Sequence, residues 1–214
     1  MKKYLPFIIV GVVAVLAIGG VLILHKVNLP VATDNTQQEG AAVPDLPQDQ
    51  RPTVALIPST DGHTLMLRIL NIKVPSAISM DYELTWTANN TGTASTQGTS
   101  GTIQLNGQMT IERSNLLLGS ESSGKKRYDK GVENGKLTLR FRDSNGKLLG
   151  KVSSDWHLQT ETTTLTSVDG SFKYTLPKPA TGIWFITIMP FGTPDPASVV
   201  TFSSGWAIYA SAKF

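Results

Sequence analysis

The chain has 214 residues, of which 40% are hydrophobic and 16% charged, and this is enough for one ordinary folded domain with attachments. Its net charge of +3 is too small to require a nucleic-acid partner. The absence of cysteine excludes disulfides, thiol catalysis and cysteine-based metal sites.

The first feature along the chain is an uncharged, apolar run from Leu5 to Leu24. As a helix it would reach about 30 Å, the thickness of the hydrocarbon core of a bilayer. Lys2 and Lys3 precede it, so the positive-inside rule keeps the N-terminus in the cytoplasm and exports the remainder. We predict a single-pass anchor over residues 1–26 that holds the protein in the cell membrane. The alternative is a signal peptide cleaved near Ala17, which would also export the remainder.

Residues 27–52 contain four prolines and four acidic residues, and no aromatic residue. A segment of this composition cannot bury enough apolar surface to fold by itself. We therefore predict a disordered linker that holds the following domain away from the bilayer.

Residues 53–214 have the pattern of an all-β domain. Alternation of apolar and polar residues predicts half-buried strands over 80–87, 137–142 and 171–176. Segments 65–72, 183–189 and 199–209 are apolar on both faces, which is typical of central or doubly covered strands. Five Asx-Gly pairs predict tight turns: Asp61-Gly62, Asn106-Gly107, Asn134-Gly135, Asn145-Gly146 and Asp169-Gly170.

The spacing of these strands predicts the fold. Short strands separated by turn signals favour one antiparallel, immunoglobulin-like β-sandwich of about eight to ten strands over residues 53–214. A closed barrel is the alternative. The stretch Asn89–Gly101 is rich in Ser, Thr and Gly, so we predict a flexible loop there. Asp143-Ser144-Asn145-Gly146 resembles the start of a calcium loop, but the later glutamate is missing and a hairpin turn explains it better.

Three segments carry a resemblance to a known family: Leu116–Gly124 (LLLGSESSG), Arg127–Val132 (RYDKGV) and Leu137–Asp143 (LTLRFRD). They resemble uncharacterised membrane-anchored bacterial proteins that have one N-terminal span and an exported immunoglobulin-like or fibronectin-like domain. Asp143–Leu149 and Pro179–Gly182 are weakly similar to an immunoglobulin-like domain associated with spore germination proteins. The resemblance implies a fold and an exported location. It brings no catalytic residues, because the matching positions are mostly turn and core residues.

The search for catalytic chemistry finds no convergent set. The three histidines fall at the membrane boundary (His25), in a turn (His63) and at a strand end (His157). Ser154 and His157 would lie on opposite faces of one strand, which argues against a hydrolytic triad with Asp155. We predict no catalytic, cofactor or metal site. The four tryptophans form either core or a sugar-stacking platform: Trp86, Trp156, Trp184 and Trp206.

Charge is distributed unevenly within the predicted domain. Nine basic and three acidic residues lie between Lys125 and Lys151. If the basic side chains face water, they form a patch that attracts anionic lipid, polymer or an acidic partner. The alternative is that the like charges only keep strand edges from aggregating. We call these residues the basic set: Lys125, Lys126, Arg127, Lys130, Lys136, Arg140, Arg142, Lys147 and Lys151.

Together these patterns predict a membrane-tethered, non-catalytic module that binds an envelope protein or an anionic surface polymer. Its export excludes cytoplasmic nucleic acid as a partner, and no cofactor is implied. The alternative function is a small hydrolase acting on envelope material through a site without a recognisable motif.

Overall fold

The computed structural model describes residues 43–194, 196 and 199–213. The predicted anchor and the first part of the predicted linker lie outside these residues. None of the helices in the described ranges is long and apolar enough to cross a membrane. Residues 43–213 belong to one compact unit, which begins at Val43. Apart from the 3-10 turn η2 (Gln48–Gln50), its regular secondary structure consists of β-strands.

The smaller of two main sheets contains three antiparallel strands in the order β1-β2-β5. Their bounds are β1 (Thr53–Pro58), β2 (Thr64–Leu70) and β5 (Ile111–Leu117). Alternate residues of β2 are buried and half-exposed, so one face of this small sheet is in the core and the other faces water. The apolar pattern of residues 65–72 had suggested burial on both faces, and the half-exposed Met66, Arg68 and Leu70 correct this expectation.

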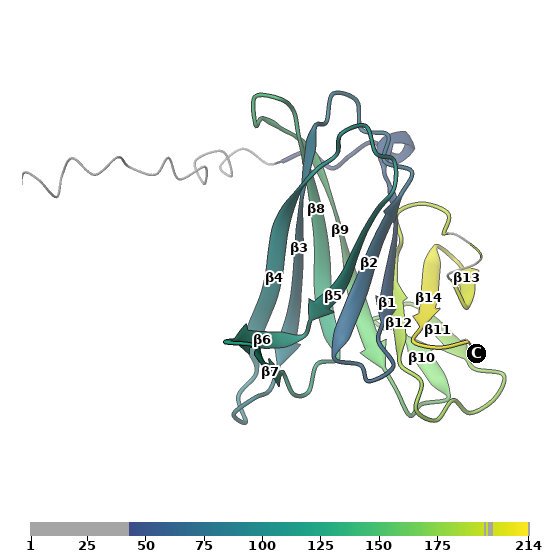
Figure 1. Cartoon of the computed structure of the whole chain (residues 1–214). Helices are drawn as coiled ribbons and strands as arrows, with labels where there is room; N and C mark the ends of the chain where they lie inside the picture. The colour runs from purple at the N-terminus through teal and green to yellow at the C-terminus, as the bar shows by residue number, and fades with distance from the viewer. Residues whose placement is uncertain (1–42, 195, 197–198, 214) are drawn as a thin grey trace, which may run out of the picture. The chain divides into compact units, whose positions relative to one another are not determined.

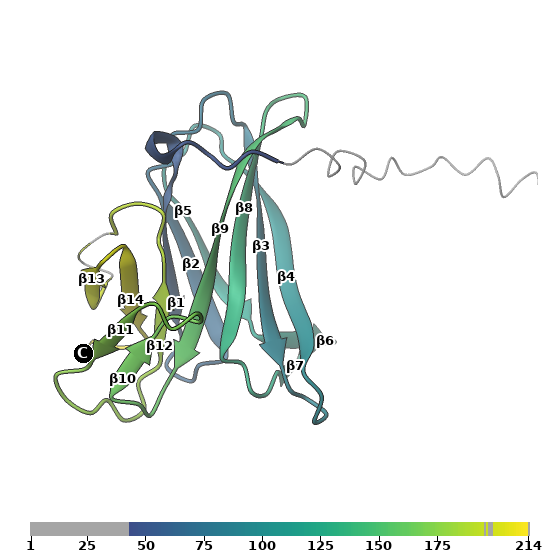
Figure 2. The ribbon, with the colours of Figure 1, turned by 180° about the vertical axis from the view of Figure 1, so that it is seen from behind.

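The large sheet contains seven antiparallel strands in the order β13-β14-β12-β9-β8-β3-β4. It lies opposite the small sheet, which stands in front of it in Figure 1 and behind it in Figure 2. Its strands are β3 (Ser79–Ala88), β4 (Ser95–Gln104), β8 (Asn134–Arg142), β9 (Leu148–Gln159), β12 (Phe185–Ile188), β13 (Thr201–Ser203) and β14 (Trp206–Ala210).

Two short ribbons complete the unit. One pairs β6 (Gly119–Ser122) with β7 (Lys125–Tyr128), and the other pairs β10 (Thr164–Thr166) with β11 (Lys173–Thr175). The predicted all-β, antiparallel class is thus confirmed, and two facing sheets are consistent with a β-sandwich. The ten strands of the two main sheets reach the upper limit of the predicted number, and the ribbons add four.

The principal core fills the space between the two main sheets. Leu56, Leu67, Met80 and Phe141 are completely buried there. A second cluster lies on the other face of β12 and β14, where Leu165, from the β10–β11 ribbon, packs with Phe185 and Ile208. Every residue of β12 is therefore buried, which confirms the two-sided apolar pattern for residues 185–188. The prediction extended too far, because Ile183 and Trp184 are half-buried and Met189 is 44% exposed.

The folded unit begins earlier than the sequence suggested. The end of the predicted linker, residues 43–52, contains Leu46, which is only 2% exposed and belongs to the main core. Backbone bonds fix this segment to β9: Leu46 N–H donates to Lys151 O at 2.9 Å, and Lys151 N–H donates to Pro44 O at 3.1 Å. The Leu46 side chain occupies the space that a Cβ on Gly150 would need. The sequence could not reveal this, because a single leucine in a proline-rich segment does not indicate that it packs against a distant glycine, Gly150.

Three further local predictions need correction. Asn134-Gly135 is not a turn but the start of β8, where a Cβ on Gly135 would collide with the Trp156 ring and the Thr85 carbonyl. Most of the predicted loop Asn89–Gly101 is paired strand, because β4 begins at Ser95. The apolar run 199–209 is divided into β13 and β14 by a turn, in which Gly205 has φ 81°.

Candidate functional site

The structure distributes the basic set over separate surfaces. Lys125, Lys126 and Arg127 lie on β7, near the lower end of the unit in Figure 1. Lys147 lies at the opposite end, in the β8–β9 turn, where the Asp143 carboxylate accepts backbone N–H bonds from Asn145 and Lys147, as expected of a hairpin turn. The remaining members occupy the strands and the loop between these two ends: Lys130, Lys136, Arg140, Arg142 and Lys151.

Ion pairs neutralise the cations on the outer face of the large sheet. Arg140 contacts Glu83 at 2.8 Å, and Arg142 contacts Asp81 at 2.7 Å. Lys136 pairs with Asp155 at 3.0 Å. These acids lie on β3 and β9, which flank β8 in the sheet. The sequence indicated that Asp81 and Glu83 share one exposed strand face, but not that β8 would be the neighbouring strand. The net positive charge of β8 was therefore overestimated.

The β6–β7 ribbon, which we call the basic hairpin, retains its charge. All four residues of β7 are exposed. Among the described residues, none of the carboxylates forms an ion pair with Lys125, Lys126 or Arg127. One acid, Glu121, is the cross-strand neighbour of Lys126. The hairpin is therefore the surface of this unit on which members of the basic set are both clustered and available to an anion.

Two contacts hold the basic hairpin in a defined position. The Tyr128 ring stacks on the ring of His63, in the β1–β2 turn, with centroids 4.1 Å apart and planes 4° apart. The Asp129 carboxylate accepts bonds from Trp86 Nε1 at 2.7 Å and Asn90 Nδ2 at 2.8 Å. Asp129 therefore connects the end of the hairpin to Trp86 and Asn90. The cations of β7 project from a supported ribbon rather than from a free loop.

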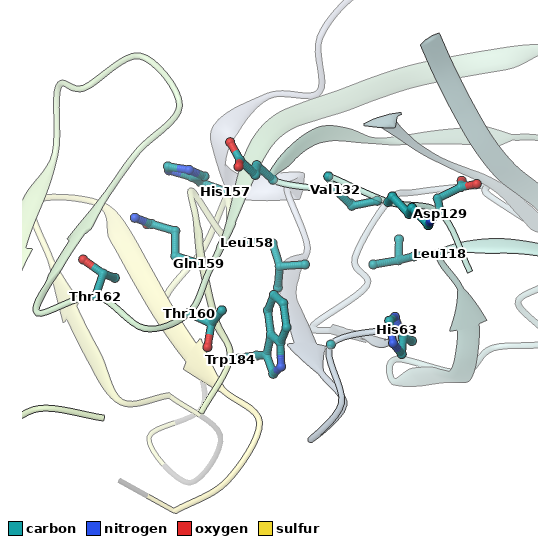
Figure 3. Close-up of a pocket in the computed structure, with 14 residues that line it drawn as sticks. His63, Leu118, Asp129, Val132, His157, Leu158, Gln159, Thr160, Thr162 and Trp184 are labelled. Carbon is teal, nitrogen blue, oxygen red and sulfur yellow. The ribbon is translucent and has the colours of Figure 1, made fainter. Parts of the chain in front are cut away.

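A cavity of about 550 Å3 opens beside the base of this hairpin. Its walls come from the β1–β2 turn, the loop 129–133 before β8, the end of β9 and the residue Trp184 before β12. In Figure 3 the indole of Trp184 lies between His63 on one side and Gln159 and His157 on the other. Such a mixture of an aromatic wall and polar groups is typical of small-ligand pockets.

Hydrogen bonds within the β1–β2 turn fix the part of the cavity wall that contains His63. In the β1–β2 turn, the Asp61 carboxylate accepts bonds from Ser59 Oγ at 2.6 Å and from the His63 N–H at 3.0 Å. These bonds hold the pKa of Asp61 below its usual value, because they stabilise the ionised form. Gly62 has φ 71°, and its α-carbon lies against the Trp184 ring with no room for a Cβ.

Several polar groups of the cavity are already used by the fold. Thr160 Oγ1 donates to Ile183 O, and Thr162 Oγ1 donates to Thr164 O, both at 3.0 Å. His157 Nδ1 lies 2.9 Å from Thr166 O, and because a carbonyl oxygen only accepts, Nδ1 is the donor of this bond. Asp129, Glu133 and Lys130 place two acidic side chains and one basic side chain in the wall. The cavity can therefore hydrogen-bond a polar ligand.

The structure also places the residues considered for catalysis. Ser154 is buried on the inner side of β9, where its Oγ contacts Asp155 O and the Met189 N–H. Asp155 is exposed on the outer side and pairs with Lys136. The three triad candidates are thus not brought together. The described residues contain no group of three His, Asp or Glu side chains arranged to hold a metal.

The four tryptophans do not form one platform. Trp86 and Trp156 are buried in the main core, which resolves their role in favour of packing. Trp206 packs against the second core, with its ring 5.9 Å from that of Phe172. Trp184 alone among them lines the cavity. Its neighbours in the cavity wall come from distant parts of the chain, so no local sequence signal could have identified it.

Comparison with known proteins adds no assignment. No protein-family model matches the chain, and no curated protein matches it. A function is therefore inferred from the charge, the cavity and the topology of the described unit.

Proposed function

We propose that this chain is a membrane-tethered, non-catalytic binding module. Its exported domain binds an anionic envelope partner, either a surface polymer or an acidic protein, through the basic hairpin. The observation that carries the proposal is the contrast between β7, whose three cations form no ion pair with the described carboxylates, and β8, whose three cations are paired. The anchor over residues 1–26 places this surface outside the cell.

The topology supports an immunoglobulin-like assignment for seven of the first nine strands, all except β6 and β7. In immunoglobulin-type sandwiches one sheet contains strands A, B and E, and the other contains C, F and G, to which a further strand C′ is added beside C. The small sheet β1-β2-β5 corresponds to A-B-E, and β4-β3-β8-β9 corresponds to C′-C-F-G. A tryptophan buried on strand C is common in this class, and Trp86 lies on β3. Such domains are widespread binding modules, which is an analogy of fold and not of site.

Electrostatics favours the hairpin as the contact. Exposed cations of one sign attract polyanions over about 10 Å at 0.1 M salt, and the attraction weakens as salt rises. The cations on β8 contribute little at a distance, because each is accompanied by a carboxylate within 3.0 Å. The stacked pair of His63 and Tyr128 beside the cations offers flat surface to a sugar or peptide group.

The test uses the full chain in detergent and two immobilised probes, polyphosphate and poly-glutamate. The triple variant Lys125→Glu, Lys126→Glu and Arg127→Glu should elute at much lower salt than the wild type. The matched control makes the same charge change on three exposed lysines elsewhere, with Lys73→Glu, Lys147→Glu and Lys173→Glu.

The control should retain most of the wild-type salt resistance. Equal loss in both triple variants would mean that only net charge matters, and the hairpin would then not be a site. Preference for polyphosphate over poly-glutamate would indicate a phosphate-rich polymer, and the reverse preference would indicate an acidic protein.

A further inference from the structure

The free edge of the large sheet is an unusual strand. β4 contains ten residues, Ser95–Gln104, and pairs with β3 along its whole length without a register shift. Its residues are Ser, Thr, Gln, Gly and a single Ile, with no charge and no proline. Among the strands of the described residues, none but β3 pairs with β4, so its outer side has no strand partner. A long, regular, uncharged edge leaves a row of backbone N–H and C=O groups ready to pair with another strand.

The other edges of the two main sheets are protected, as edges of soluble proteins usually are. β13, at the far end of the large sheet, is only three residues long. In the small sheet, β5 includes Glu112 and Arg113 and meets β2 with a register shift. Beside the other edge of that sheet, the β1 residue Val54 donates its N–H to Pro190 O at 2.9 Å. β4 alone among these edges has none of these devices.

A second observation concerns the ring of Tyr82. On β3 this residue is directly opposite Gly101 of β4. The hydroxyl end of the half-buried ring lies over Gly101, within 3.0 Å of the position that a Cβ would occupy. The missing side chain thus lets the ring extend across β4. A further strand added at this edge would find an aromatic surface to cover as well as backbone groups to bond.

We propose that β4 pairs with β4 of a second copy of this chain. The two strands run antiparallel about a two-fold axis at their centre, so that two large sheets become continuous. The absence of charge on β4 favours this occupant, because the same surface meets itself without like-charge repulsion. This inference is independent of the proposed anionic partner, since it uses none of the residues of the basic hairpin.

The pleat restricts the register. Ile103, Gly101 and Thr99 point to the core side of the sheet, whereas Thr102 and Ser100 point outward. Continuous inner faces require core-side residues to lie opposite core-side residues. This condition is met only if one residue of β4 lies directly opposite its own copy on the two-fold axis. Pairing along most of the strand then requires that residue to be Thr99 or Ser100, at the middle of β4. Pairing limited to one strand buries less than the usual stable interface, so the dimer should form in a concentration-dependent way.

The absence of native cysteine makes a crosslinking test direct. Single cysteines are introduced at Thr96, Thr99, Ser100, Thr102 and Gln104 of the full chain, which is oxidised in detergent with copper phenanthroline. A disulfide needs Cα atoms within about 7 Å, and only the residue on the axis lies that close to its own copy. In the register centred on Ser100, Thr96 would be about 27 Å from its copy.

The expected result is a strong covalent dimer for Thr99→Cys or Ser100→Cys and almost none for Thr96→Cys or Gln104→Cys. Mixing Thr96→Cys with Thr102→Cys should give a heterodimer if the axis is at Thr99, and mixing with Gln104→Cys should do so if it is at Ser100. Thr175→Cys, exposed on β11, is the collision control. Equal yields at all β4 positions, or no yield above this control, would overturn the proposal.

Sedimentation of the cysteine-free chain gives a second readout. The wild type should change from monomer to dimer as its concentration rises, whereas Ser100→Lys should remain monomeric because two like charges would meet near the axis. Thr175→Lys adds the same charge elsewhere and should dimerise like the wild type. Equal dimerisation of Ser100→Lys and wild type would contradict pairing through β4.

Discussion

At the residue scale, two turns of nearly identical design have different surroundings. The β1–β2 turn Ser59–Thr64 and the β10–β11 turn Ser167–Phe172 both use a serine and an aspartate to bind the backbone. Their glycines have φ 71° and 70°. A Cβ on Gly170 would meet open space, whereas a Cβ on Gly62 would overlap with the Trp184 ring. Substituting Gly170 therefore tests backbone strain alone, whereas substituting Gly62 tests the same strain together with packing against Trp184.

We predict that Gly170→Ala costs about 1 kcal/mol of stability, because alanine disfavours positive φ. Gly62→Ala should cost about 1–3 kcal/mol more, because the indole must move away from an overpacked position. Urea unfolding of the full chain measures both values, and the tryptophan emission of the folded protein should shift only for Gly62→Ala. Equal costs for the two variants would show that Gly62 does not support the cavity wall.

At the element scale, the segment before β1 acts as part of the domain. Leu46 is buried, and two backbone bonds connect this segment to β9. We predict that Leu46→Ala lowers the free energy of unfolding by about 2–3 kcal/mol, as is usual for a buried leucine. Asp49→Ala, at an exposed position of the same segment, should change it by less than about 0.5 kcal/mol. If residues 43–52 were only linker, both variants would unfold like the wild type.

How much the sequence predicted also depends on scale. Strands whose signal is local were found: the alternation at Met80–Thr87 became β3, and that at Leu137–Arg142 lies within β8. Signals that depend on a distant partner were misinterpreted. Gly135 was taken for a turn residue because Trp156, which excludes a side chain there, is remote in sequence. β4 was taken for a loop because its ladder comes from β3 and not from its own Ser, Thr and Gly residues.

The same limit applied to the candidate site. The segment from Lys125 to Lys151 is strongly basic when its charges are summed along the sequence. In the folded unit, however, Asp81 and Glu83 of the neighbouring strand β3 form ion pairs with two arginines of β8. The basic hairpin could be recognised from its own residues. The cavity beside it could not, because His63, Gln159 and Trp184 converge only after the sheets have formed.

At the scale of the whole molecule, the two proposed surfaces lie on different elements and should cooperate. A dimer joined through β4 carries two basic hairpins, so its second contact with a long polyanion becomes intramolecular and gains effective concentration. We predict that the wild type dissociates from a polyphosphate-coated surface at least about tenfold more slowly than Ser100→Lys. On a short oligophosphate that reaches only one hairpin, the two proteins should dissociate at the same rate. Surface-binding kinetics of the full chain measures both rates, and a Ser100→Lys defect that persisted on the short ligand would place β4 within the anion-binding surface instead.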